Sequence, residues 1–194
     1  MEQAIHFLNS ILSLDPDLRS YLESKFRTDR YKKKAILVKE GDIARRIGFI
    51  EKGLVRGYCI KEDGSEFTYW FMKEGDIMIS VDSFFNQTPA DEFVEVVEPA
   101  IIHSITYGEL QDALERWATF KAHQAFFLQK YYQQSIRRER MRVMSGHDKI
   151  DFLVKNYPWL LDRAQGKHIA SFLSLTPNYY STVKGQYFEA NPRR

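Results

Sequence analysis

Residues 110–144 read LQDALERWATFKAHQAFFLQKYYQQSIRRERMRVM, a run without glycine or proline. Apolar residues recur in it at steps of three and four, which predicts a long helix with an apolar stripe. The stripe consists of Leu110, Leu114, Trp117, Ala118, Ala122, Ala125, Leu128 (or Gln129), Tyr132 and Ile136. A second apolar set, Phe120, Phe127 and Tyr131, lies on a different face. A helix that is apolar on two faces needs two surfaces to bury them against.

Two interpretations of this helix stay open. It is either an ordinary core helix of one domain, or it packs one face on its own domain and the other on a partner helix. Its length favours dimerisation, because helical patterns well beyond about 25 residues are unusual inside one globule. The predicted dimer interface consists of Ala118, Ala122, Ala125, Leu128, Tyr132 and Ile136.

The two sides of the helix differ in charge. Residues 1–106 carry 14 Lys and Arg against 18 Asp and Glu, whereas residues 107–194 carry 14 against 8. An acidic half joined to a basic half indicates that only the C-terminal half binds a polyanion. A short leading helix is expected around Tyr107 to Glu115, before the long one. We therefore expect one domain at residues 1–116, a dimerisation helix at 117–145 and a second domain at 146–194.

The region before the helix predicts an α+β fold built on a β-roll. Two short helices are expected over residues 2–13 and 15–26. Turn signals then recur about every 11 or 12 residues, at Gly41-Asp42, Gly53, Asp63-Gly64 and Gly75-Asp76. The expected strands are 46–50, 54–60, 66–72, 77–81, 92–97 and 100–106, with Pro99 between the last two. Short strands at such intervals are typical of an antiparallel sandwich or barrel, here a jelly roll.

Composition excludes several classes of protein and site. Cys59 is the only cysteine, so no disulfide or multi-cysteine metal site is expected. The five histidines are scattered and no phosphate loop, nucleophile elbow or zinc-protease motif occurs, which argues against an enzyme, a metal or a cofactor. His103 could serve as an axial haem ligand, but a lone histidine in a strand is more often structural. No apolar run is long enough to span a membrane and no export signal is visible, so we expect a cytoplasmic protein.

Residues 166–185 read GKHIASFLSLTPNYYSTVKG and fit a helix-turn-helix. In that geometry the inward positions are Ile169, Ala170, Leu173, Leu175, Tyr180 and Val183. Ser174 stands where the turn usually has glycine and needs a left-handed backbone. The outer face of the second helix would meet base edges and phosphates. The predicted DNA-binding residues are Thr176, Asn178, Tyr179, Ser181, Thr182 and Lys184. An ordinary helical hairpin is the alternative.

The order of these parts resembles the Crp/Fnr transcription regulators, the group of the catabolite activator protein. The resemblance rests on EKGLVRGYCIKEDGSEFTYWFMKEGD (51–76), the long helix, and KHIASFLSLTPNYYSTVK (167–184). It implies a cyclic-nucleotide-binding-like β-roll, a dimerisation helix and a winged helix-turn-helix that reads a palindrome. It also implies that Asn178, Ser181 and Thr182 contact bases. The family commonly has a basic residue at the position of Thr182, so a different base preference is expected.

The resemblance also locates a ligand pocket, where this chain departs from the family. Nucleotide-binding members use a Gly-Glu pair for the ribose and, further on, an Arg-Ser or Arg-Ala pair for the cyclic phosphate. Residues 75–77 match the first part with an aspartate in place of glutamate, but the second part aligns with Ala90-Asp91 and has no arginine. A charge-assisted contact worth roughly 1.5–3 kcal/mol per bond is lost. Asp91 and Glu92 would also repel a phosphate.

We therefore expect no useful binding of cyclic AMP or cyclic GMP. The predicted pocket residues are Trp70, Gly75, Asp76, Ile77, Phe84, Phe85, Asp91 and Phe93. The pocket would take an uncharged or cationic molecule, or nothing, and its aromatic residues would otherwise be plain core.

The function that follows is that of a homodimeric regulator, in which an effector shifts the DNA-binding pair about a hinge at Ser145-Gly146. The expected partners are double-stranded palindromic DNA, a second copy of the chain, RNA polymerase and an unidentified effector, with no membrane. Two alternatives stay open: a sensing and dimerising module with degenerate DNA binding, and a cyclic-nucleotide-binding regulator with an atypical pocket.

Overall fold

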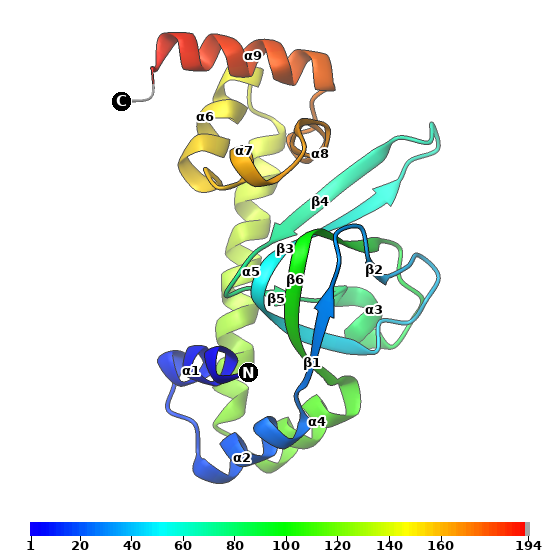
Figure 1. Cartoon of the computed structure of the whole chain (residues 1–194), viewed down its shortest axis with the longest axis vertical. Helices are drawn as coiled ribbons and strands as arrows, with labels where there is room; N and C mark the ends of the chain where they lie inside the picture. The colour runs from blue at the N-terminus through cyan, green and yellow to red at the C-terminus, as the bar shows by residue number, and fades with distance from the viewer. Residues whose placement is uncertain (193–194) are drawn as a thin grey trace. The chain divides into compact units, whose positions relative to one another are not determined.

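The computed structural model describes residues 1–192, and Figure 1 labels its elements. The helices are α1 (Glu2–Ile11), α2 (Pro16–Lys25), α3 (Val81–Asn86), α4 (Tyr107–Arg116), α5 (Phe120–Arg142), α6 (Gly146–Asn156), α7 (Leu160–Arg163), α8 (Gly166–Phe172) and α9 (Pro177–Ala190). The strands are β1 (Arg27–Tyr31), β2 (Ile36–Val38), β3 (Arg46–Ile60), β4 (Glu66–Met72), β5 (Ile77–Met78) and β6 (Phe93–Thr106).

The described chain divides into two compact units. The first contains Met1–Cys59 and Trp70–Lys130, and the second contains Ile60–Tyr69 and the residues from Tyr131 onward. The tip of the β3–β4 hairpin thus belongs to the same unit as the C-terminal helices, and α5 contributes to both units. These limits follow from contacts alone, so the functional boundaries at 116/117 and 145/146 stay a prediction.

The long antiparallel strands β3 and β6 form the centre of the sheet in the first unit (Figure 1). The sheet order is β1-β6-β3-β4, with β2 also paired to β6 and β5 to β3. We expected breaks at Gly53 and Pro99, but each strand runs through its break point. The register instead shifts between Ile50 and Val55, and Gly53 has a φ of +105°. The glycine and proline therefore mark a bulge and not two turns.

Gly53 is required for the close approach of β3 to β6. A Cβ at this position would lie 2.7 Å from the backbone of both Pro99 and Ala100. β5 is shorter than the expected strand 77–81 because Ile79 and Ser80 lead into α3, for which Ser80 is the N-cap residue.

Aliphatic and aromatic side chains fill the interior of the first unit. The fully buried ones include Leu18, Leu22, Ile50, Leu54, Phe84 and Ile102. His123, at the start of α5, places Nε2 3.0 Å from the carbonyl of Leu8 and 3.1 Å from that of Leu12, and so donates to the last turn of α1. His123 Nδ1 is buried and has no hydrogen-bond partner within residues 1–192. The ring therefore caps the end of α1 and fixes it on α5.

The run 110–144 covers two helices, and α4 is the short leading helix expected around residues 107–115. α4 begins with a capping box formed by Thr106 and Glu109 and ends at Arg116. Trp117 has an extended backbone, and its ring lies 5.2 Å from that of Tyr21, so packing on α2 interrupts the helical pattern. Ala118 precedes α5 and is exposed. It therefore does not lie on α5 with the other residues of the predicted stripe, and its place in a dimer interface stays a prediction.

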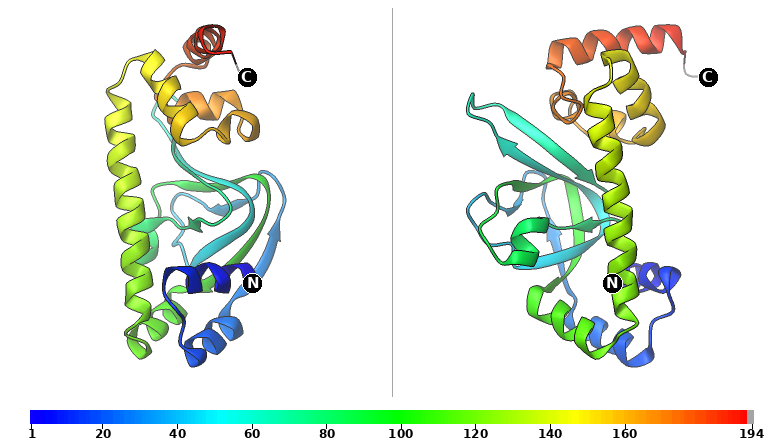
Figure 2. Two further views of the ribbon diagram at one scale, coloured as in Figure 1. Left: turned by 90° about the vertical axis from the view of Figure 1, so that its left-hand side faces the viewer. Right: turned by 180° about the vertical axis from the view of Figure 1, so that it is seen from behind.

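In the second unit, α9 packs on α6 and α8 (Figure 2). The predicted inward positions are buried, as expected: Ile169, Ala170, Leu173, Tyr180 and Val183, with Leu175 half-buried. Ser174 has the expected left-handed backbone, with a φ of +54°. The winged form of the prediction is not seen in residues 1–192, because no strand follows β6 there and α9 continues to Ala190.

Candidate nucleic-acid interface and sensor site

The α8–α9 pair of the second unit forms a tight helical corner. The amide of Leu175 donates to the carbonyl of Ala170 at 2.9 Å and closes the turn. The Thr176 hydroxyl accepts from the amide of Tyr179 at 3.3 Å and caps α9, and Pro177 occupies its first turn. Proline loses no needed hydrogen bond there. Because Thr176 caps the N-terminus of α9, the outer face of that helix is formed by the residues that follow Thr176.

The structure brings three of the predicted DNA-binding residues together on the outer face of α9: Asn178, Ser181 and Thr182 are exposed and one turn apart. The other predictions have different surroundings. Lys184 is half-buried with its ammonium 5.4 Å from the centre of the Tyr180 ring. Tyr179 is 48% exposed, but its ring also covers part of α6.

The Tyr179 ring packs so closely on the start of α6 that position 146 has no room for a side chain. A Cβ on Gly146 would lie 2.6 Å from the Tyr179 hydroxyl and 2.8 Å from two ring carbons. Ser145 caps α6 by accepting from the amide of Asp148. Gly146 is therefore a close-packing residue inside the second unit. A hinge at Ser145-Gly146 stays a prediction.

Several Arg and Lys side chains of the second unit have solvent-exposed charged groups. Arg137 and Arg140 on α5 and Lys167 on α8 are exposed and form no ion pair within the described part of the chain. Arg142 is partly neutralised by Glu139, at 2.9 Å, and its guanidinium lies 5.3 Å from the Phe67 ring. Free cations of this kind supply the phosphate contacts on which non-specific DNA affinity depends.

The hairpin tip is attached to the first helix of the pair through Ser171. Its hydroxyl donates to the carbonyl of Glu66 and accepts from the amide of Thr68, both at 2.8 Å. One side chain on α8 thus satisfies two backbone groups of the β3–β4 hairpin, within the second unit.

The face of α5 predicted for dimerisation is open to solvent. Leu128 is 54% exposed and Tyr132 69%, and Ala122 and Ala125 are exposed, while Ile136 is half-buried. The second apolar set behaves differently: Phe120 is buried, and Phe127 and Tyr131 are half-buried. The two faces of the helix are therefore distinct. One is covered and the other, the α5 stripe (Ala122, Ala125, Leu128, Tyr132 and Ile136), is not.

Asp76, predicted as a ribose ligand, has other partners in the first unit. Gly75 and Asp76 lie in the turn between β4 and β5, before α3 begins at Val81. One Asp76 oxygen pairs with the Lys130 ammonium on α5 at 2.8 Å, and the other accepts from the amide of Lys73 at 3.1 Å. One oxygen thus ties the turn to α5, and the other holds the turn itself closed.

Trp70 lines the interior of the β-roll beside a buried acid that we did not predict. The Trp70 indole lies directly over Gly57, whose Cβ would be 2.2 Å from the ring, and its Nε1 donates to Glu92 at 3.1 Å. Glu92 is 7% exposed, and burial raises its pKa to about 7, opposed by hydrogen bonds from Ser80 and Trp70. Asp91, which is exposed, adds a further negative charge nearby. The surroundings of Glu92 therefore disfavour an anion.

The remaining predicted pocket residues are divided between core and sheet. Phe84 is fully buried and packs edge-on against Phe85 and Tyr107. Phe93 stacks on Tyr58 at 5.2 Å. Arg56, on the same strand as Tyr58, is 2% exposed and pairs with Glu95 at 2.6 Å. These aromatics act mainly as packing.

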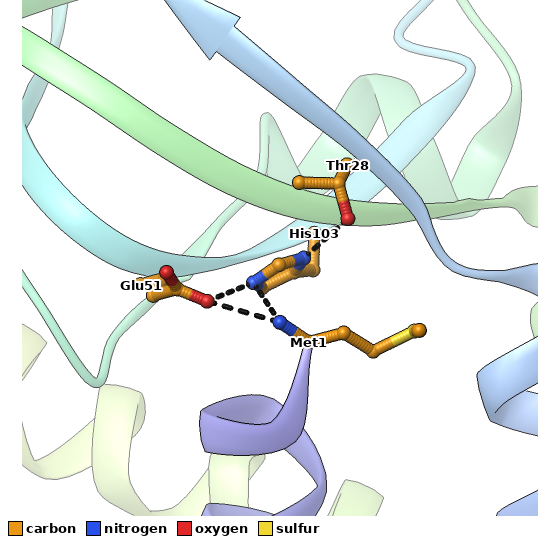
Figure 3. Close-up of polar contacts among 4 residues, drawn as sticks. All are labelled: Met1, Thr28, Glu51 and His103. Carbon is orange, nitrogen blue, oxygen red and sulfur yellow. Dashed lines mark hydrogen bonds and ion pairs between the residues drawn. The ribbon is translucent and has the colours of Figure 1, made fainter.

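A second polar cluster surrounds His103 (Figure 3). His103 Nε2 contacts a carboxylate oxygen of Glu51, and Nδ1 lies 2.8 Å from the Thr28 hydroxyl. The Met1 amine lies 3.0 Å from the same Glu51 oxygen, and these contacts hold the pKa of Glu51 below its usual value. Both ring nitrogens of His103 are engaged within the protein, which leaves neither for an axial metal bond.

Residues 1–192 contain neither a metal cluster nor a membrane-spanning helix. No group of three or more His, Cys, Asp and Glu residues is arranged to hold a metal ion there. No helix in that range is long and apolar enough to cross a membrane.

Comparison with known proteins identifies the domain and the fold. Residues 28–116 match the family model of the cyclic nucleotide-binding domain. No curated protein sequence matches the chain. FixK2 from Bradyrhizobium japonicum has a similar structure, with a TM-score of 0.73 and 14% identity over 85% of each chain.

Two further solved structures agree. A CooA mutant from Carboxydothermus hydrogenoformans gives a TM-score of 0.67 and 21% identity over 88% of this chain and 79% of that one. A transcriptional regulator assigned to the Crp/Fnr family, from Eubacterium rectale, gives 0.71 and 12% over 91% and 84%. Residues 28–116 thus match the cyclic nucleotide-binding domain, and the chain has a fold similar to that of solved Crp/Fnr regulators.

Proposed function

We propose that this protein is a homodimeric transcription regulator of Crp/Fnr type, which binds double-stranded DNA through α8 and α9. The observation that carries the proposal is the outer face of α9. Asn178, Ser181 and Thr182 stand exposed on it, at the start of the second helix of a tight helical corner. Side chains at that position of a helix-turn-helix meet base edges in the major groove. The free cations Arg137, Arg140 and Lys167 of the same unit supply phosphate contacts.

The α5 stripe is the proposed dimer interface. It presents small and aromatic side chains at helical spacing over four turns, and Leu128 and Tyr132 are more than half exposed. A second copy of the same stripe is a self-complementary partner, as two-fold symmetry requires. Such a dimer would present two recognition helices to half-sites about 34 Å apart along DNA.

The proposed sensor is the β-roll of residues 28–116, but its effector is not a cyclic nucleotide held by an arginine. No Arg or Lys occurs between Ser80 and Phe93. Both oxygens of Asp76 are engaged with Lys130 and Lys73, and the buried acid Glu92 lies beside Asp91. A phosphate there would be desolvated next to negative charge. An uncharged or cationic effector fits this chemistry. A contact with RNA polymerase and a cytoplasmic location belong to the same proposal.

The test is selection of the purified full-length protein against randomised double-stranded DNA at physiological salt. Enrichment of a two-fold-symmetric site, with affinity that falls steeply as salt rises, is the expected result. Equal, weak retention of every sequence would favour the second candidate, a sensing and dimerising module with degenerate DNA binding. The second candidate stays open because the outer face of α9 carries no charged side chain.

A matched pair of variants tests whether the interface is the one proposed. Ser181→Glu places a negative charge on the outer face of α9 and should abolish DNA binding. Glu62→Gln changes a charge on the exposed β3–β4 turn and should leave binding unchanged. Binding that survives Ser181→Glu would place the DNA contact elsewhere on the protein.

A further inference from the structure

We infer that α9 reads adenine–thymine pairs, through Asn178 and Thr182, and lacks the arginine or lysine that would read guanine with two hydrogen bonds. The inference rests on the proposed function, because it concerns the bases that this helix would meet.

The outer face of α9 is uncharged over its first two turns. It consists of Asn178, Ser181, Thr182, Gly185 and Gln186, which are all exposed. Lys184 is the only Arg or Lys in α9, and its ammonium lies over the Tyr180 ring rather than on this face. Guanine is most often read by an arginine or lysine that donates two hydrogen bonds to O6 and N7. The face has no side chain that can make that contact.

Asn178 has the chemistry that matches adenine. Its side chain makes no hydrogen bond within the described chain, whereas Asn156 and Asn191 in the same unit donate to the carbonyls of Phe152 and Tyr187, both at 2.9 Å. A free amide offers one donor and one acceptor side by side, which is the complement of adenine N7 and N6. Asn178 lies in the first turn of α9, the part of a recognition helix that contacts bases.

Thr182 adds a preference against guanine. Its hydroxyl donates to the carbonyl of Asn178 at 3.2 Å, so the proton is used inside the helix and only acceptor capacity is left. The major-groove edge of guanine presents acceptors only. The hydroxyl therefore cannot pair with guanine, but it can accept from adenine N6 or cytosine N4. The threonine methyl, which can contact the thymine methyl, is what favours an adenine–thymine pair.

Gly185 and Ser181 do not select a base, but they permit the contacts of Asn178 and Thr182 with the base edges. A Cβ on Gly185 would meet nothing within 4 Å, so the helix surface is flat at the second turn and allows close approach to the groove. The Ser181 hydroxyl can donate or accept and pairs with any base edge. Asn178 and Thr182 are thus the residues that discriminate.

The first experiment combines selection with base substitution. The selected site is expected to contain adenine in each half-site, at a position whose preference disappears in Asn178→Ala. Replacing that adenine by 7-deazaadenine, which lacks the N7 acceptor, should weaken wild-type binding about tenfold and leave Asn178→Ala unaffected. Asn191→Ala, the same substitution at the other end of α9, is the matched control and should respond to the deaza base as the wild type does.

A second variant separates base reading from a structural effect. Asn178→Asp keeps the size and position of the side chain but leaves only acceptors, so the preference should move from adenine to cytosine, whose N4 donates. A guanine at the position controlled by Asn178, or an adenine preference that survives Asn178→Ala, would overturn the inference while the proposed function stands. Absence of DNA binding at every salt concentration would overturn both.

Discussion

Glu92 is a buried carboxyl whose folded-state pKa, about 7, lies above its unfolded value of 4.5. The folded protein therefore binds this proton more tightly than the unfolded chain. The contribution to stability is fully present below about pH 4.5 and is lost as pH rises through about pH 7. The difference between the two pKa values corresponds to about 3 kcal/mol.

Glu92→Gln should therefore stabilise the protein by about 2–3 kcal/mol at about pH 8 and change little at about pH 4.5. The amide keeps an acceptor for Trp70 Nε1 and removes the buried charge. Urea unfolding across this pH range measures the effect. Asp91→Asn, on the exposed neighbour, is the control and should flatten the pH dependence far less. A Glu92→Gln variant with the pH profile of the wild type would show that the carboxyl is not desolvated in solution.

Gly146→Ala should destabilise the second unit by about 1–3 kcal/mol, because overpacking must displace the Tyr179 ring. The same change in a Tyr179→Ala background should be neutral or stabilise by about 0.5 kcal/mol, since alanine is the better helix residue. Thermal unfolding of the four proteins gives the coupling energy. Equal effects of Gly146→Ala in both backgrounds would favour the backbone flexibility expected of a hinge over close packing.

The α5 stripe leads to a prediction at the level of one element. Leu128→Arg places a charge at the centre of the proposed helix pair and should convert the dimer to a monomer without loss of fold, because Leu128 is 54% exposed in the single chain. Gln133→Arg, on an exposed position of α5 outside the stripe, should leave the dimer intact. Sedimentation velocity reports the mass of each. A wild-type protein that is monomeric at micromolar concentration would refute the interface.

Helical and strand elements were visible in the sequence as periodicity, but the continuity of the strands was not. The break between α4 and α5 agrees with the short leading helix expected around residues 107–115, and the contact of the Trp117 ring with Tyr21 accompanies it. Gly53 and Pro99 are ordinary turn signals, yet each lies inside a long bent strand. The attachment of the hairpin tip to α8 through Ser171 joins residues more than 100 positions apart, which no local pattern encodes.

The candidate sites were predictable to different degrees. The exposed residues of α9 followed from helix-turn-helix spacing, because the inward positions fix the outward ones. Glu92 was not found as a buried group, since it stands next to Asp91 in a stretch that looks solvated. The available signal was the alternation of Glu92 with Val94 and Val96, which places all three on one face of the strand.

At the scale of the molecule, charge separates the two activities proposed for it. Most of the proposed sensor, residues 28–116, lies in the acidic residues 1–106, and the proposed DNA-binding helices lie in the basic residues 107–194. A sensor that carries negative charge is kept from binding nucleic acid itself, and it also disfavours an anionic effector. The same charge distribution thus supports DNA binding by the second unit and argues against a cyclic phosphate in the first.

Cyclic AMP and cyclic GMP should therefore neither bind measurably at millimolar concentration nor change the affinity for the selected DNA site. Isothermal calorimetry and DNA titration with and without nucleotide measure the two effects. A double variant, Asp91→Arg with Glu92→Gln, supplies a cation next to Ala90, the residue aligned with the family's arginine, and removes the buried acid, so any gain of nucleotide affinity should appear there first. Micromolar binding of cyclic AMP to the wild type, lost on Asp76→Ala, would instead identify an atypical nucleotide pocket that uses the turn between β4 and β5. Because Asp76 is paired with Lys130 on α5, such binding would have to compete with that ion pair, and DNA affinity would then respond to the nucleotide through α5.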